Sequence, residues 1–133
     1  MQLQRVHPDQ VQQVYDLLRT HGWAHRVENM AQFTQLIAAS QVADVAVIDK
    51  QVVGFVRGIS DGLSNGYLSM LVVAAAQRRK GIGRQLVEHT IAANTSVTWM
   101  LRAGREGAPE FFAKLGFVAS SIAMERLRTT PPP

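Results

Sequence analysis

The chain has no cysteine among its 133 residues. This absence excludes disulfide bonds, thiolate metal sites and a cysteine nucleophile, so any chemistry must use other groups. Long apolar runs are missing as well, since no segment reaches the ~18 apolar residues of a membrane span and none follows the opening residues 1–5. We therefore expect a cytoplasmic protein that makes no contact with a membrane.

The composition is that of an ordinary globular domain. Apolar residues make up 47% of the chain and charged residues 18%, which is enough to build a buried core. We predict a single domain over residues 1–128. The end of the chain, residues 129–133, is rich in proline and cannot join a sheet, so we predict a flexible tail there.

Basic residues are unevenly distributed. The net charge is +4, and eleven of the fourteen basic residues are arginine, whose planar guanidinium binds phosphate oxygens in pairs. Arg78, Arg79, Lys80 and Arg84 lie close together, whereas residues 62–85 contain no acidic side chain. The cluster indicates an anion-binding surface, and a solvated basic face is the alternative.

Hydrophobic periodicity predicts a mixed α/β chain. In order, the pattern indicates two helices, a β-hairpin, a third strand, a helix, a fourth extended segment, a short helix and a last extended run. These elements cover residues 9–21, 28–40, 45–56, 67–73, 86–94, 97–101, 109–116 and 122–127. The strand at 67–73 is apolar at nearly every position, so we expect it to be buried on both faces.

A glycine-rich basic loop follows that strand and precedes a helix. Its sequence is Arg78-Arg79-Lys80-Gly81-Ile82-Gly83. Two glycines at this place let backbone N–H groups approach an anion, and the helix N-terminus adds positive potential. The loop lacks the third glycine of a dinucleotide fingerprint, and the chain has no Gly-x-x-x-x-Gly-Lys-Ser/Thr motif, so NAD and nucleoside triphosphates are poor candidates for the ligand.

The same loop resembles the acetyl-CoA signature of the GNAT N-acetyltransferase family, Arg/Gln-x-x-Gly-x-Gly/Ala. The strand at 67–73 is similar to the family's fourth strand, and residues 111–117 (Phe-Phe-Ala-Lys-Leu-Gly-Phe) are similar to its aromatic-x-Lys-Leu-Gly-Phe segment. Specific motifs lie within residues 52–117. The resemblance implies a mixed, mostly antiparallel central sheet with splayed fourth and fifth strands, flanked by about four helices.

The resemblance also implies an acyl-CoA-dependent N-acetyltransferase, in which an amine attacks the thioester of acetyl-CoA directly. The pantetheine arm would bind the open strand edge, and the pyrophosphate would bind the amides of residues 79–84. A free strand N–H near Val72 or Val73 would polarise the acetyl carbonyl. The cofactor-binding residues implied in this way are Leu71, Val72, Val73, Arg78, Arg79, Lys80, Gly81, Ile82, Gly83, Arg84 and Phe112.

The chain departs from the family where its acid and base are often found. Phe112 stands where a tyrosine often protonates the departing thiolate, and Arg105 stands where an asparagine is common. Asp61, Glu106 and Tyr67 are candidates for proton transfer or for holding the amine. Each has a plainer interpretation: a turn former for Asp61, a solvated loop charge for Glu106 and a core or rim aromatic for Tyr67.

The acceptor is a small-molecule or peptide amine that the sequence does not identify. Trp23, His25 and Arg26 occupy the segment that covers the acceptor pocket in relatives. The four histidines show no metal-ligand spacing, so we expect no metal. A protein that binds acyl-CoA as a sensor, without turnover, is the alternative. CoA phosphates already account for the basic residues, which argues against nucleic acid, and a homodimer is a further expectation from the resemblance.

Overall fold

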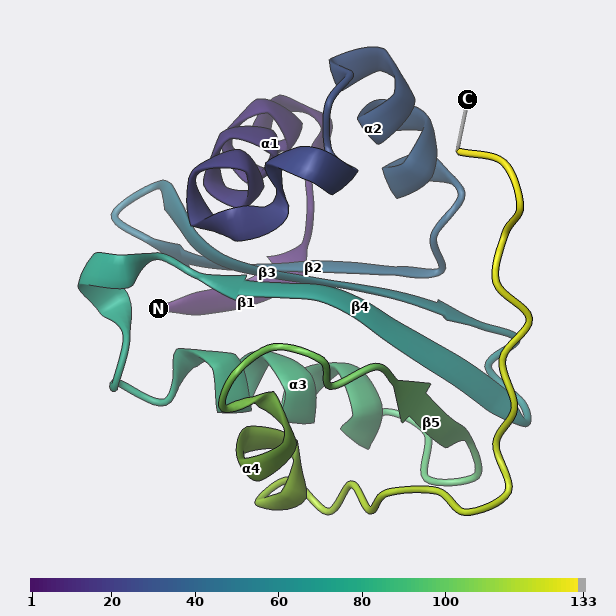
Figure 1. The fold of residues 1–133 in the computed structure, drawn as a ribbon. Coiled ribbons are helices and arrows are strands. Elements are labelled where there is room, and N and C mark those ends of the chain that lie inside the picture. Colours follow the sequence, from purple (N-terminus) through teal and green to yellow (C-terminus); the bar gives the residue numbers. More distant parts are fainter. Residues whose placement is uncertain (132–133) are drawn as a thin grey trace. The chain divides into compact units, whose positions relative to one another are not determined.

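The computed structural model describes residues 1–131 and divides into two compact units, Met1–Arg102 and a second unit that begins at Ala103. The first unit contains a five-stranded sheet whose strands follow the chain order (Figure 1). The strands are β1 (Gln2–Arg5), β2 (Val42–Ile48), β3 (Gln51–Ser60), β4 (Asn65–Val73) and β5 (Thr98–Leu101). Pairing from β1 to β4 is antiparallel and β5 runs parallel to β4, which confirms the predicted mixed, mostly antiparallel sheet.

Helices cover both faces of this sheet. In Figure 1, α1 (Val11–Leu18) and α2 (Met30–Ala38) lie on one face, and α3 (Ile82–Ala92) lies on the other. The N-cap Asn29 starts α2, because its side-chain oxygen accepts a hydrogen bond from the N–H of Gln32 at 3.0 Å. In the second unit, α4 spans Ala108–Ala113 and Gly116 follows it at φ +92°. These helices confirm the ones that hydrophobic periodicity predicts.

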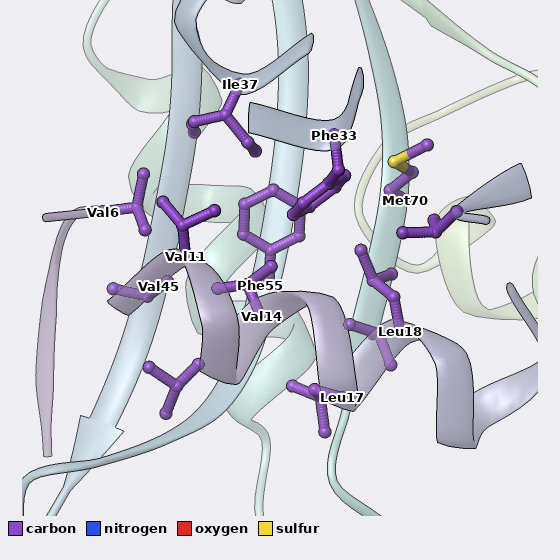
Figure 2. Packing of buried hydrophobic residues seen from close by; sticks show 14 of the residues in the cluster. Val6, Val11, Val14, Leu17, Leu18, Phe33, Ile37, Val45, Phe55 and Met70 are labelled. Carbon is purple, nitrogen blue, oxygen red and sulfur yellow. The ribbon is translucent and has the colours of Figure 1, made fainter. Parts of the chain in front are cut away.

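The main core lies between the sheet and the first two helices. Figure 2 shows Phe55 of β3 at its centre, fully buried, with Phe33 of α2 beside it at 6.5 Å between ring centroids. Val14 and Leu18 of α1 are also fully buried there. On the opposite face, a Cβ at Gly54 would lie 2.9 Å from the Leu86 side chain, so the small residue lets α3 pack closely against β3.

Three predicted features differ from the structure. β1 was not expected, because residues 2–5 carry a single apolar side chain, yet they pair with β2 from Gln2↔Val47 onward. The predicted extended run at 122–127 forms no strand, and its apolar side chains are exposed. β4 is not buried on both faces: its residues alternate between buried and half-buried, because alternate side chains of a strand point to opposite faces.

The domain boundaries remain predictions. Residues 129–131 are exposed and belong to no helix or strand, whereas residues 132–133 of the predicted tail lie outside the described residues.

Candidate functional site

The fifth strand pairs with only the first part of the fourth strand. Their register runs from Asn65↔Thr98 to Leu68↔Leu101, and residues 69–73 of β4 pair with β3 alone. At the paired end, the Trp99 ring covers Gly66 so closely that a Cβ there would lie 2.4 Å from the ring. The sheet therefore opens a free edge of β4 beyond Leu68, as the predicted splay requires.

A β-bulge lies on this open stretch. Phe55 pairs with Val72 and Arg57 pairs with Ser69, so two residues of β4, Met70 and Leu71, stand opposite the single residue Val56. Met70 has φ +57°, a left-handed conformation that is strained for a residue with a side chain. A bulge interrupts the one-to-one pairing of two strands, so Met70 and Leu71 have no direct partner residue on β3.

The basic loop follows the open edge directly. After β4 comes a short 3-10 turn at Ala75–Gln77, and Gly81 then caps α3 at φ +77°. Arg79 also adopts a left-handed conformation, with φ +66°. Such alternating backbone conformations form anion-binding concavities of successive N–H groups. Within residues 1–131, no carbonyl accepts from the N–H groups of residues 79–84, which are free for a ligand.

The side chains of the loop are cationic and exposed. Arg78 donates from Nε to the Val73 carbonyl at 3.3 Å, and Lys80 donates to Gln77 Oε1 at 3.0 Å. Arg84 pairs with Glu88 at 2.9 Å, but both side chains are at least half exposed, so the pair is weak and yields easily to a phosphate. Arg78, Arg79 and Lys80 have no carboxylate partner in the described part of the chain. The first unit thus brings together the predicted loop residues and Leu71, Val72 and Val73.

The Asp61 carboxylate is fully engaged in hydrogen bonds within its own turn. Its Oδ1 accepts hydrogen bonds from the N–H groups of Leu63, Ser64 and Asn65, and its Oδ2 accepts one from the Ser64 hydroxyl at 2.6 Å. The Ser64 hydroxyl and these backbone N–H groups hold the pKa of the Asp61 carboxyl far below its ordinary range. A carboxylate of such low basicity is a poor general base, and it organises the turn between β3 and β4.

The other candidates for proton transfer are divided between the two units. Tyr67 is half-buried on β4, two residues before the bulge region begins at Ser69. Glu106 and Phe112 belong to the second unit, where Glu106 is exposed. Phe112 packs edge-on against Phe111 at 5.0 Å and Phe117 at 5.6 Å between ring centroids.

The predicted acceptor segment forms tight turns between α1 and α2. Arg26 stacks over the Trp23 ring at 5.8 Å, and His25 is exposed. His21 connects this segment to the region after β4, because its Nε2 accepts a hydrogen bond from the Ala75 N–H at 3.1 Å. A hydrogen bond therefore links this segment to the chain between β4 and the basic loop.

One charged residue on the sheet escaped the sequence analysis. Arg57 lies half-buried in β3, and its Nε donates to Ser40 Oγ at 2.8 Å. The sequence signal that could have singled it out is its position as one arginine within the otherwise apolar residues 52–59. Near it, an open depression of about 490 Å³ lies over the ends of β3, β4 and β5. Its lining residues are Gln41, Ile59, Ser60, Asp61, Asn65, Gly66, Tyr67 and Met100.

The described residues offer neither a metal site nor a membrane-spanning helix. Over residues 1–131, no group of three or more His, Asp or Glu side chains is arranged to hold a metal ion. None of the helices in the same range has both the length and the apolar character needed to cross a membrane.

Comparison with known proteins places the chain in a family. Residues 39–119 match the acetyltransferase (GNAT) domain model, so the chain belongs to the GNAT acetyltransferase family. No curated protein sequence gives a significant match.

Solved structures match the fold over most of the chain. A probable acetyltransferase from meticillin-resistant Staphylococcus aureus is 15% identical, with a TM-score of 0.80 and 98% of both chains covered. An aminoglycoside 6'-acetyltransferase of type Ii is 26% identical, with a TM-score of 0.73, covering 86% of this chain and 81% of that one. An aminoglycoside 6'-N-acetyltransferase complexed with coenzyme A is 25% identical, with a TM-score of 0.62 over 70% of this chain and 54% of that one. The α/β fold with its mostly antiparallel sheet is therefore the GNAT fold.

Proposed function

We propose that the protein transfers an acetyl group from acetyl-CoA to a primary amine. The observation that carries this proposal is the alignment, in one unit, of an open strand edge, a bulge and a basic loop with unclaimed N–H groups. An extended pantetheine arm fits the edge of residues 69–73 as an added strand. The pyrophosphate fits the loop of residues 79–84, and Arg78, Arg79, Lys80 and Arg84 compensate its charge.

The proposed reaction needs few catalytic groups. The neutral amine nitrogen attacks the thioester carbonyl carbon, the C–N bond forms, and the C–S bond then breaks to release the CoA thiolate. A strand N–H near Val72 stabilises the oxyanion, and the amine proton passes to the thiolate or to water. Alignment of two bound reactants lowers the barrier by about 7 kcal/mol or more, so a chain with Phe112 in place of an acidic hydroxyl can still turn over.

Thiol release from acetyl-CoA over a panel of amines tests this proposal. Aminoglycosides belong in the panel, because two structures of similar fold are aminoglycoside acetyltransferases, together with amino acids, polyamines and peptides. Amine-dependent release, with the acetylated product seen by mass spectrometry, is the expected result. Tight binding without release from any amine would contradict transfer and favour the CoA-binding sensor, which the missing hydroxyl at Phe112 supports. Assays on a cytoplasmic fraction would check the expected location.

A further inference from the structure

An apolar row borders the depression at the ends of β3, β4 and β5. Ile59, Tyr67 and Met100 are direct cross-strand neighbours, so their side chains project from the same face of the sheet. Ile59 is 42% exposed and Met100 is 45% exposed, and no other side chain in the described residues covers them fully. A flat apolar surface beside the open edge of β4 suits a ligand with an apolar group.

Arg57 lies next to this row on the same face. It is two residues before Ile59 along β3, and its cross-strand partner is Ser69, the last residue before the bulge. The Arg57 Nε is engaged by Ser40, but its two terminal nitrogens donate to no acceptor within residues 1–131. These N–H groups form the planar pair that binds a carboxylate in a bidentate manner.

Helix capping does not explain these free donors. Just after α2, the carbonyls of Ser40 and Gln41 each accept a hydrogen bond from the Arg5 guanidinium, at 3.1 Å and 2.9 Å. Arg57 touches the same region only through the Ser40 hydroxyl. The two terminal nitrogens of Arg57 therefore have no structural role among the described residues.

The surroundings of Arg57 favour an anion over a cation. Burial, and secondly the positive charge of Arg26, lower the pKa of the Arg57 guanidinium, while Tyr67 acts in the opposite direction. An arginine remains charged at neutral pH, so a bound anion relieves this unfavourable environment. Asp61 is the acidic residue that lines the depression, and its carboxylate is already compensated by four hydrogen bonds.

We propose that the acceptor is a primary amine that carries a carboxylate, bound by Arg57 with help from Arg26, and an apolar group that lies on Ile59, Tyr67 and Met100. This inference rests on the proposed acetyl transfer and names its acceptor class. An apolar amino acid or short peptide satisfies it. Polycationic amines such as aminoglycosides do not, because two arginines repel them and the Asp61 carboxylate in the depression is already compensated by its hydrogen bonds.

The test measures binding of a product pair, so that it does not depend on turnover. The protein is saturated with coenzyme A and titrated with N-acetyl-L-phenylalanine or with its uncharged amide. The wild-type protein binds the carboxylate about 10-fold more tightly, the value of one charge-assisted interaction. Arg57→Gln removes this preference. Lys50→Gln, the same loss of charge in the β2–β3 turn, retains it.

Other results would separate the two proposals. Equal binding of acid and amide to the wild-type protein, binding of neither, or a preference that survives Arg57→Gln would overturn the carboxylate site. If Arg57→Gln no longer binds coenzyme A, the variant Arg26→Gln is used in its place. This exposed substitution should weaken the preference for the carboxylate about threefold, as expected for a neighbouring surface charge. An unchanged preference in Arg26→Gln would again overturn the site. Thiol release with kanamycin but not with phenylalanine would support transfer and contradict this acceptor class. A carboxylate preference without any thiol release would contradict transfer alone.

Discussion

Gly81 and Gly62 form a matched pair for testing the loop. Both have left-handed backbones, with φ of +77° at Gly81 and +72° at Gly62. An added Cβ would meet open space at Gly62, and at Gly81 it would make one ordinary van der Waals contact, at 3.9 Å. An alanine at either position lowers the free energy of unfolding by about 1 kcal/mol through backbone strain. Only Gly81→Ala should weaken acetyl-CoA binding, because it alters the N–H groups that we assign to the pyrophosphate. Equal affinities for acetyl-CoA in the two variants, by calorimetric titration, would contradict this assignment.

Phe112 gives a second prediction at the scale of the residue. If protonation of the thiolate limits turnover, Phe112→Tyr supplies the missing acid and raises kcat up to about 100-fold, the lower end of the range for a general acid. Phe111→Tyr is the control, because it adds the same hydroxyl to the neighbouring half-buried ring. Steady-state thiol release compares the two variants. No gain from Phe112→Tyr would show that protonation is handled elsewhere or is not limiting.

Site residues can be predicted from the sequence where a local motif occurs between recognisable secondary-structure elements. The basic loop between a strand and a helix predicts a phosphate site at residues 78–84, because phosphate recognition uses backbone N–H groups and charges that are close together in the sequence. This assignment stays a prediction. Arg57 was missed because its meaning depends on long-range packing. Its free donors matter only once Ser40, Arg5 and the register with Ser69 are known. The role of Asp61 as a turn former was one of the interpretations weighed, and its hydrogen bonds support that interpretation.

At the scale of elements, the short pairing of β4 with β5 fixes where the sheet opens. Gly66→Ala would place a Cβ 2.4 Å from the Trp99 ring and should destabilise the protein by about 1–3 kcal/mol through overpacking. The double variant Gly66→Ala with Trp99→Leu makes room and should recover part of this loss. Urea unfolding measures all three proteins. A neutral Gly66→Ala would contradict the close packing of the two strands.

Local sequence patterns predicted most helices and strands, but they failed where a strand depends on a partner strand distant in the sequence. The hairpin of β2 and β3 was predictable from two β-branched runs around a turn, and α3 from its apolar spacing. β1 has almost no pattern of its own and depends on the edge that β2 offers. The run at 122–127 has strand-like composition, but a strand needs a partner, and it has none among the described strands.

For the whole molecule, the net charge and the expected self-association each lead to a prediction. The basic loop on a chain of net charge +4 predicts that acetyl-CoA binding weakens as salt rises, because screening acts on exposed charges. Because CoA phosphates already account for the basic loop, we expect only weak RNA binding in a filter assay. A homodimer stays a prediction, which light scattering over a range of protein concentrations would check.

The most direct test of the central claim is a calorimetric titration of acetyl-CoA into the wild-type protein at low salt. The open β4 edge and the unclaimed N–H groups of residues 79–84 predict saturable binding of one acetyl-CoA per chain, weakened in Gly81→Ala. Absence of binding to a folded protein would contradict the assignment of the loop, and with it the proposed transfer.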